Sequence, residues 1–466
     1  MEVREVKEVR EGGIPKVRQY ALRLTFRTFH TFRTSSISCT LLRMPSYAAF
    51  LGHQPHLSLA ELTALLPDCT VTDSSFPQIV VFQTMRELDQ EFLKTLGGTM
   101  VIARSVLENT QSVTLEDVPQ ILLSALGSGR GKATFSLRTV GLTPKSVRML
   151  YRRCKDRLKD AGRPSRYVGN EKKPALPLLL HQHDMLTGKR GCELVILILG
   201  KEEERTLWIG RTVAAQDVVA YTHRDVEKPV RDTTVGLLPP KLAQMLMNFG
   251  LFLVRSQRGE LPTKRSKPLP LTVYDPFCGT GVIPMECLVR GWNVLASDLS
   301  QKAVNGCTKN IEWIRKELKI LKKDVASTVW KQDAGKPFDL KKTPPDVIVT
   351  ETSLGPSLIA RPTQKDVSKL KAESEKLQAS FLENAAKTLP SVPIVCAWPA
   401  WRQKGGWVHL ENIWKTVEKL KYRPMLPPHT DPLGPRHFSL LYQRSDQFVG
   451  REIVLLMPPK TTSKEA

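Results

Sequence analysis

The stretch Asp275-Pro276-Phe277-Cys278-Gly279-Thr280-Gly281 stands directly after the apolar run Leu271-Thr272-Val273-Tyr274. A short β-branched run, an acidic residue and a Gly-x-Gly turn are typical of a strand that leads into a nucleotide-binding helix. Glycine lets the backbone turn tightly and come close to a ligand that a Cβ atom would hold away. The stretch therefore predicts an α/β domain with a ligand site at the end of its first strand.

The residues that follow narrow the choice of ligand. A dinucleotide site has the pattern Gly-x-Gly-x-x-Gly, and Pro284 stands at the third glycine position of that pattern. Asp275, just before the turn, instead suits a positively charged ligand of the methionine type. The next predicted strand, 292–297, leads to Asp298, which lies 298 − 275 = 23 residues after Asp275. An acidic residue about 20 positions on is placed to bind ribose hydroxyls.

Two more acidic residues follow predicted strands of the same domain. Asp333 comes after a long basic helix, and Glu351 ends the strand 346–350. Open parallel sheets bind ligands at the carboxyl ends of their strands, so the acidic residues are expected to line one edge. This order of elements resembles the class I S-adenosylmethionine-dependent methyltransferases. A nucleotide site of another kind, or a glycine-rich turn without a ligand, is the alternative.

Composition excludes some classes of protein. With 466 residues, the chain is long enough for two or three domains. A hydrophobic content of 41% and a charged content of 25% are those of a globular protein. No apolar run approaches the roughly 20 residues that span a bilayer. The net charge of +23 predicts a polyanionic partner, most simply nucleic acid, although a solvated basic surface would have the same charge.

The eight cysteines are scattered and include no Cys-x-x-Cys pair. The sequence therefore predicts no bound metal and no disulfide framework. Cys278, inside the glycine turn, is interpreted as a small packing residue rather than a nucleophile. This cysteine usage fits a reducing compartment, and we expect a cytoplasmic location.

The first 43 residues differ from the rest of the chain. No acidic residue occurs from 12 to 60, while arginine recurs among serine, threonine and phenylalanine. Such a start is typical of a transit peptide. The charged first eleven residues fit that interpretation poorly, and Met44 offers an alternative start. We therefore treat 1–43 as a basic extension outside the fold.

Two small α/β modules are predicted before the methyltransferase-like domain. The first, 44–105, starts with a strand at 47–51, and Ser58 with Glu61 is expected to form the capping box of the helix that follows. A second helix is expected at 85–96. The other module, 106–215, contains a strand at 133–138, a basic helix at 144–161 and a further strand at 176–181. A bridging segment and linker, 216–270, then leads to the domain 271–459.

The basic helix of the second module is a candidate RNA-binding surface. Its cations include Lys145, Arg148, Arg152 and Arg153, several of them three or four positions apart and so on one face. A basic helix beside a small sheet is suited to contact phosphates. A solvated helix face is the alternative.

A second segment narrows the resemblance. Residues 225–250 contain Asp225, Lys228-Pro229-Val230 and a run from Gly236 to Asn248 that includes Pro239-Pro240-Lys241. Together with 275–281, this segment resembles the THUMP-associated tRNA guanosine N2-methyltransferase family. The resemblance covers about residues 46–457. It implies that THUMP-like modules dock tRNA and that a Rossmann-like class I domain methylates it with S-adenosylmethionine.

The resemblance also implies roles for individual residues. A helix starting at 239–243 would lie over the cofactor, the glycine turn would line its methionine end, Asp298 would bind the ribose and Asp333 the adenine amine. A plain helix cap at Thr280 and an ordinary loop acid at Asp333 are alternatives. The implied cofactor-binding residues are Pro239, Lys241, Asp275, Phe277, Cys278, Gly279, Thr280, Gly281, Asp298, Leu299, Asp333 and Ala334.

The sequence departs from the family at the catalytic motif. The family has Asp-Pro-Pro-Tyr-Gly, or asparagine first, where this chain has Glu351-Thr352-Ser353-Leu354-Gly355. In the family the acidic or amide side chain and the proline carbonyl accept the hydrogens of a base amine, and the aromatic ring stacks on the base. Glu351 and the Thr352 carbonyl keep the acceptors, whereas Leu354 offers only an apolar contact. Lost stacking would weaken binding by about 1–3 kcal/mol per base.

Three functions stay open at this point. The first is an RNA methyltransferase with Glu351, Thr352 and Leu354 at its catalytic site, acting on a guanosine of tRNA. The second is a tRNA-binding homologue with impaired catalysis, in which Glu351 is a structural acid. The third is a methyltransferase for ribosomal RNA or DNA. Trp398 and Trp401 are candidates for a replacement stacking surface, and the resemblance implies a small activator subunit as a partner.

Overall fold

Residues 44–107, 113–127, 131–200, 205–232, 237–260, 270–340, 344–433 and 438–459 are described by the computed structural model. All of them belong to one compact unit, Met44–Ala466. The predicted extension 1–43 lies outside the described residues, as do 233–236 and 261–269 of the predicted bridging segment and linker, 216–270. None of the described helices is both long and apolar enough to cross a membrane.

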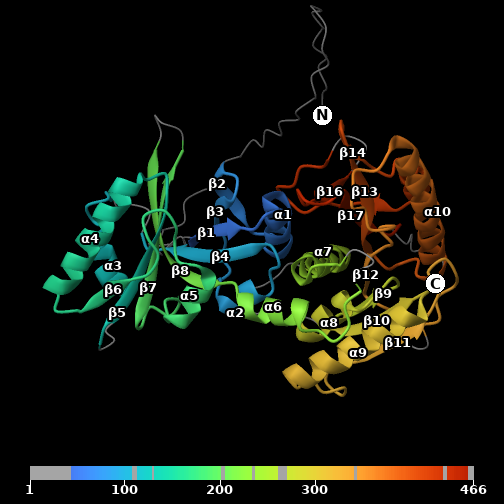
Figure 1. Ribbon diagram of the computed structural model, residues 1–466, viewed down its shortest axis with the longest axis horizontal. Coiled ribbons are helices and arrows are strands. Elements are labelled where there is room, and N and C mark those ends of the chain that lie inside the picture. Colours follow the sequence, from blue (N-terminus) through green and yellow to red (C-terminus); the bar gives the residue numbers. More distant parts are fainter. Residues whose placement is uncertain are drawn as a thin grey trace, which may run out of the picture. The chain divides into compact units, whose positions relative to one another are not determined.

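The amino-terminal part is built on an eight-stranded sheet of order β2-β3-β1-β4-β8-β7-β5-β6 (Figure 1). The strands are β1 Ser46–Leu51, β2 Thr70–Phe76, β3 Ile79–Gln83, β4 Thr99–Ser105, β5 Ala133–Val140, β6 Ser165–Tyr167, β7 Gly191–Leu199 and β8 Thr206–Ala215. The helices of this part are α1 Pro55–Leu65, α2 Gln90–Lys94, α3 Val118–Ala125, α4 Pro144–Asp160, α5 Pro177–Gln182 and α6 Val218–Val226.

The strands of the two predicted modules join in this one sheet. β4, from the first module, pairs antiparallel with β8, from the second, with Val101 opposite Ala215. Backbone hydrogen bonds between these two strands therefore join the two predicted modules. The boundary drawn at 105/106 lies just after β4, inside a structure that is continuous across it.

Three local predictions for this part differ from the structure. Residues 176–181 form not a strand but the helix α5, which has Pro177 in its first turn, where the missing N–H is no loss. The helix expected at 85–96 is limited to α2, where the Asp89 side chain accepts from the Phe92 N–H. The helix α1 starts at Pro55 without a side-chain cap, so Ser58 and Glu61 do not form a capping box.

The carboxyl-terminal part has a nine-stranded sheet of main order β11-β10-β9-β12-β13-β17-β15, with β14 paired to β13 and β16 to β17. The strands are β9 Thr272–Asp275, β10 Asn293–Asp298, β11 Ser327–Lys331, β12 Val347–Glu351, β13 Ile394–Gln403, β14 Gly406–Val408, β15 Arg423–Pro424, β16 Ser439–Tyr442 and β17 Val449–Met457. β9 to β13 run parallel, and β17 is antiparallel to β13. This is the Rossmann-like arrangement expected of a class I methyltransferase domain. The last two strands, β16 and β17, pair antiparallel.

Both faces of this sheet are covered by helices: α7 Pro240–Arg258, α8 Val282–Val289, α9 Gln301–Leu318, α10 Gln364–Thr388 and α11 Ile413–Lys419. Successive residues of a strand point to opposite faces. Val347 and Val349 accordingly belong to the core that includes α7, α8 and α9, whereas Ile348 belongs to the core with Phe381 of α10. From β9, the next strands in sequence, β10 and β11, lie on one side of it, whereas β12 and β13 lie on the other. Such a change of direction leaves a crevice at the carboxyl ends of the strands.

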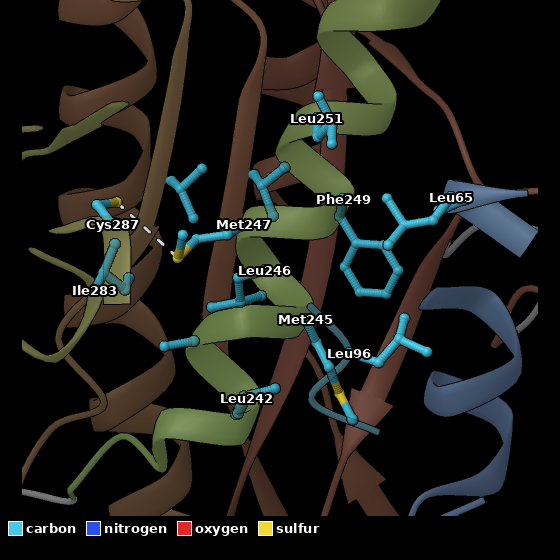
Figure 2. Close-up of a cluster of buried hydrophobic side chains, with 14 of the residues drawn as sticks. Leu65, Leu96, Leu242, Met245, Leu246, Met247, Phe249, Leu251, Ile283 and Cys287 are labelled. Carbon is cyan, nitrogen blue, oxygen red and sulfur yellow. Dashed lines mark hydrogen bonds between the residues drawn. The ribbon is translucent and has the colours of Figure 1, made fainter. Parts of the chain in front are cut away.

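Helix α7 contributes to one core that includes side chains of both parts of the chain. Figure 2 shows Phe249 pointing toward Leu65, which ends α1, while Met247 points the other way toward Cys287 of α8. The Met247 and Cys287 sulfur atoms are 4.0 Å apart. The helix is therefore apolar on several sides and its residues from Leu242 to Val254 are mostly buried.

A buried polar network crosses the same junction. The two carboxylate oxygens of Glu61 accept hydrogen bonds of 2.8 Å from the Gly97 and Gly98 N–H groups, and Asn248 of α7 donates to Glu61 at 2.6 Å. Burial raises the pKa of Glu61 to about 7. Arg290 donates to the Asn248 side chain at 3.0 Å. Glu61 is thus an acceptor that ties α1 to α7.

We expect the replacement Phe249→Ala to lower the free energy of unfolding by about 3–5 kcal/mol, because Phe249 is fully buried and the change leaves a cavity. Phe252→Ala, on the same helix, is the matched control, since Phe252 is only partly buried. Urea unfolding followed by tryptophan fluorescence measures both. Equal losses for the two variants would contradict the junction packing.

Candidate cofactor and active site

A cavity of about 780 Å³ opens at the carboxyl ends of β9, β10 and β12. Its volume is in the range of sites that bind small ligands. The wall is formed by the glycine turn after β9, the end of β10, the loop at 333–334, the segment 351–355 after β12, and residues 230–232 with 237–238 before α7. Several distant segments of the chain therefore meet at the edge of the sheet where the sequence predicts a ligand site.

The glycine turn has the backbone shape that its sequence predicts. Gly279 and Gly281 have φ angles of 51° and 88°, in the left-handed region that glycine tolerates best. The Gly281 N–H donates to the Cys278 carbonyl at 2.8 Å, which closes the turn, and α8 begins directly afterwards. An ideal Cβ atom at Gly279 would meet no protein atom within 4 Å. At Gly279 the turn thus leaves open space next to its backbone.

Asp275 is buried at the bottom of this turn. Its Oδ1 accepts from the Thr350 hydroxyl at 2.6 Å and from the Phe277 N–H at 3.3 Å. Burial raises the pKa of Asp275 to about 7, and the nearby charges of Asp298 and Glu351 act in the same direction. A cationic ligand in the cavity would favour the ionised carboxylate and counter that effect.

Two more acids face the cavity from successive strand ends. Asp298 accepts from the Gly279 N–H at 3.0 Å and from the Ser300 N–H at 2.8 Å. Asp333 accepts from the Gly335 N–H at 2.9 Å. In each case backbone donors fix the carboxylate, and each oxygen has a second lone pair available for a ligand hydroxyl or amine.

Glu351 lies far from the glycine turn in the sequence, but it lines the same cavity. The Arg451 Nε atom of β17 donates to Glu351 Oε1 at 2.5 Å. The Arg451 side chain is 4% exposed and the Glu351 side chain is 12% exposed, so the ion pair is largely excluded from water. Among the described residues, Glu351 Oε2 has no hydrogen-bond donor.

Thr352 is held through its hydroxyl and its backbone N–H. Its hydroxyl donates to the Ala397 carbonyl at 3.0 Å and accepts from the Gln378 amide of α10 at 2.6 Å, while its N–H donates to the same carbonyl at 3.1 Å. Leu354 lines the cavity, and Gly355, with φ of 80°, turns the chain away. The side chain of Glu351 and the backbone of Thr352 are therefore fixed from opposite sides.

Residues 269–345 match one family model. Its description is "Conserved hypothetical protein 95", and the match covers the glycine turn, Asp298 and Asp333. No curated protein matches the chain.

Among solved structures, the chain is similar to TrmN from Thermus thermophilus, with 16% identity over 89% of this chain and 99% of that one and a TM-score of 0.45. It is also similar to a "possible methylase" from Clostridium difficile 630, with 11% identity over 91% of this chain and 100% of that one and a TM-score of 0.44. A third similar structure is magnesium protoporphyrin IX methyltransferase from Synechocystis PCC 6803, with bound SAH. The identity is 13% over 52% of this chain and 99% of that one, and the TM-score is 0.30. At TM-scores below 0.5, these overlaps do not identify the reaction.

Most of the sequence-predicted site residues meet at this cavity. The three predicted catalytic residues and most of the predicted cofactor-binding residues line it. Gly281 instead caps α8. The lining residues among those predicted are Asp275, Phe277, Cys278, Gly279, Thr280, Asp298, Leu299, Asp333, Ala334, Glu351, Thr352 and Leu354.

Pro239 and Lys241 lie elsewhere. They line a second cavity, of about 330 Å³, together with Tyr221. The Lys241 ammonium donates to the Gln216 side chain at 2.6 Å and lies 5.1 Å from the centre of the Tyr221 ring. Leu237 and Leu238, just before α7, line the larger cavity in their place.

The two tryptophans considered for base stacking are closed off. Trp398 and Trp401 are 0% and 1% exposed and belong to the core beneath α10. Neither offers a ring face to a ligand, so that expectation was wrong. Phe277 is the aromatic residue that lines the cavity, and its ring packs edge-on against Phe381.

Cys278 has the properties of a packing residue. The neighbouring Cys307 thiol and burial raise the pKa of Cys278 well above its ordinary value. Its thiol therefore stays protonated and is a poor nucleophile. Cys307 also lies where a Cβ atom at Gly281 would project, with its sulfur 2.6 Å away.

Sequence reasoning missed several residues that shape the site. Arg451 and Gln378 fix Glu351 and Thr352, and Thr350 holds Asp275. For Thr350 a signal exists, because it directly precedes Glu351 on a strand adjacent to β9. Arg451 and Gln378 have no such signal, since each lies far along the chain from its partner.

The predicted RNA-binding residues lie on α4, away from the cavity-lining segments in sequence. Lys145 is exposed, Arg148 pairs with Glu171 at 2.7 Å, and the Arg152 side chain is 86% exposed. Arg153 differs, because its side chain is 39% exposed and pairs at 2.5 Å with Glu116, which lies just before α3. Lys145, Arg148 and Arg152 therefore form one outward stripe, which Lys155 and Lys159 extend at the same spacing.

Proposed function

We propose that this protein is an S-adenosylmethionine-dependent RNA methyltransferase that methylates a base amine, most specifically N2 of a guanosine in tRNA. The observation that carries the proposal is the meeting of Glu351 and the Thr352 backbone with the glycine turn and its acids at one cavity. An acceptor pair next to a cofactor-type site is the arrangement that amine methylation requires. The basic stripe on α4 supports a nucleic-acid substrate.

The residues of the cavity fit S-adenosylmethionine. Space lies in front of Gly279, where a Cβ atom would meet no protein atom. In this proposal Asp275 balances the positive methionine end, Asp298 binds the ribose hydroxyls and Asp333 accepts from the adenine amine. S-adenosylmethionine supplies an electrophilic methyl group. The residues of the chain bind it and bring a nucleophile into line with it.

Glu351 and Thr352 act on the nucleophile. The lone pair of an exocyclic base amine is delocalised into the ring, so the amine is a poor nucleophile. Hydrogen bonds from its two hydrogens to the Glu351 carboxylate and the Thr352 carbonyl raise electron density on nitrogen and orient it. As the N–C bond formed and the bond from the methyl carbon to the cofactor sulfur broke, leaving the neutral thioether, nitrogen would become positive. The Glu351 carboxylate would stabilise that charge and is placed to take the proton.

The proposal is tested with labelled S-adenosylmethionine and unmodified tRNA transcripts, in parallel with ribosomal RNA and duplex DNA. Digestion and mass spectrometry identify the methylated nucleoside. N2-methylguanosine in tRNA is the expected product. A different methylated base amine would keep the enzyme class and change the substrate.

A second candidate function is tRNA binding without catalysis. The ion pair of Glu351 with Arg451 favours it, because a carboxylate engaged in a buried pair has a structural role as well. Normal binding of S-adenosylmethionine and tRNA without any methylated product, also in the presence of a cell extract, would favour this candidate over the first.

Two further expectations belong to the proposal. One is a small activator subunit, and the other is a cytoplasmic location. Purification of the tagged protein from its own cells, followed by mass spectrometry, tests for the subunit. Microscopy of a fluorescent fusion tests the location.

The affinity for S-adenosylmethionine is expected to rise with pH around neutrality. With a pKa of about 7, Asp275 is mostly protonated at pH 6.0 and mostly ionised at pH 7.5, and the cationic ligand prefers the ionised form. The gain is about eightfold if only the ionised form binds. Calorimetric titration measures it, with Asp275→Asn as the control that should flatten the dependence. The same pH dependence in the asparagine variant would contradict the assignment.

Neutralising the stripe on α4 is expected to weaken RNA binding. Each lost phosphate contact should lower the slope of log affinity against log salt by about 0.7–0.9. Arg152→Gln should show this effect, whereas Arg153→Gln is the matched control because the Arg153 side chain is less exposed and pairs closely with Glu116. Filter binding of tRNA at several salt concentrations measures the slopes. A larger loss for Arg153→Gln would argue against this surface.

A further inference from the structure

Arg451 reaches the candidate catalytic residue from a strand that is not its neighbour. Glu351 pairs with Ala397 of β13, and Arg451 pairs with Pro399 on the other side of the same strand. The arginine side chain therefore spans β13 to place Nε at Glu351 Oε1. It does not line the cavity, whereas Glu351 does.

The guanidinium group is itself fixed by other contacts. Arg451 Nη2 donates to the Leu237 carbonyl at 3.2 Å, and the group lies 5.7 Å from the centre of the Tyr442 ring. Only 3% of the residue is exposed. A guanidinium group stays charged and holds its donors in a rigid plane. Arg451 therefore has little freedom to release Glu351 or to follow it.

This arrangement makes the two oxygens of Glu351 unequal. Oε1 has a charged donor, and Oε2 has no donor among the described residues. The geometry points to Arg451 as a positioning residue: it engages Oε1 of Glu351 so that Oε2 accepts a hydrogen from the base amine. This inference rests on the proposed methylation of an amine and adds to it the residue that orients the acceptor.

The role of Arg451 also accounts for a glutamate at this place. Glutamate has one more rotatable bond than aspartate, so its carboxylate is less well positioned by the backbone alone. Misplacing a reacting group by about 1 Å can lower a rate by about 100-fold. The ion pair with Arg451 of β17 restricts the Glu351 carboxylate and so removes that freedom.

Glutamine at 351 separates this role from a purely structural ion pair. An amide has one acceptor oxygen, and Arg451 would take it. The amide NH₂ would then face the cavity and meet the amine hydrogens donor to donor. If Arg451 is replaced by methionine as well, the amide is free to turn its oxygen toward the amine.

The test compares wild type, Glu351→Gln, Arg451→Met, the double variant and Arg451→Lys. Methyl transfer to RNA at saturating substrates gives kcat, calorimetry gives the cofactor Kd, and thermal unfolding checks the fold. We expect each of the first two single variants to lower kcat by on the order of 10²-fold, with Kd changed less than about twofold. The double variant should be at least about tenfold faster than Glu351→Gln, and Arg451→Lys should lie between wild type and Arg451→Met.

Arg402→Met is the matched control, since Arg402 lies on β13 and donates to the Ser445 carbonyl instead. Wild-type kcat in Arg451→Met, or a double variant no faster than Glu351→Gln, would overturn the inference. If Arg451→Met unfolds because Glu351 is left unpaired, the double variant has no buried charge at the pair and still decides the question. A wild-type protein that transfers no methyl group would remove the proposed function and the inference with it.

Discussion

Glu351→Ala is expected to lower the rate of methyl transfer by on the order of 10²–10³-fold, the range found when one preorganised polar contact to a transition state is removed. The change removes the carboxylate that accepts the amine hydrogen and balances the charge that develops on nitrogen. It leaves the glycine turn, Asp275 and Asp298 intact, so the affinity for S-adenosylmethionine should hardly change. The loss therefore falls on kcat.

Single-turnover methylation with enzyme in excess measures this effect. Because alanine leaves Arg451 buried without its carboxylate, a loss of stability of about 3–5 kcal/mol is expected as well, and the assay temperature must lie below the unfolding transition. Glu373→Gln, an exposed change on α10, serves as the control. Undiminished transfer by a folded Glu351→Ala protein would exclude Glu351 as the acceptor.

Gly281→Ala is expected to lower the free energy of unfolding by about 2–5 kcal/mol. A left-handed backbone costs a non-glycine residue about 1–2 kcal/mol, and overpacking typically adds about 1–3 kcal/mol. The Gly281 φ angle is 88°, and a Cβ atom there would stand 2.6 Å from the Cys307 sulfur and 3.1 Å from its Cα atom. Helix α9 would have to shift, so cofactor binding should be lost along with stability.

Gly279→Ala is the matched comparison. Gly279 also has a positive φ angle, of 51°, but its Cβ atom would meet no protein atom within 4 Å. Its stability loss should stay near the backbone cost of about 1–2 kcal/mol. Because Gly279 lines the cavity, its cofactor affinity should still fall. Urea unfolding and calorimetry of both variants measure the difference. A Gly279→Ala protein as unstable as Gly281→Ala would contradict the packing described.

The glycine turn and the acidic residues that line the cavity could be predicted from the sequence because their pattern is local. Asp275 and Asp298 end strands of a parallel sheet and Asp333 follows one. The carboxyl ends of such strands lie at one edge whatever the details of packing. The role of Gly279 and Gly281 could be predicted for the same reason, because a tight turn into a helix needs the backbone freedom of glycine. The position of Glu351 followed from the same rule.

Other predictions were wrong where a short sequence pattern fits more than one structure. The apolar run 176–181 was read as a strand, but a run of that length fits either element, and Pro177 starts a helix there. Glu61 has the spacing of a capping box, yet its carboxylate accepts from Gly97 and Gly98, which only folding brings near it. Trp398 and Trp401 lie on a strand buried on both faces.

The α/β class, the glycine turn and the row of acidic residues follow from the amino-acid sequence alone, because they depend on periodicity and on the order of elements along the chain. The folded chain, in contrast, places Lys241 at a second cavity and makes Arg451 the partner of Glu351, which lies 100 residues before it. Side-chain direction and the register of β17 across β13 set those contacts. They arise from packing between segments whose distance in sequence leaves no local pattern.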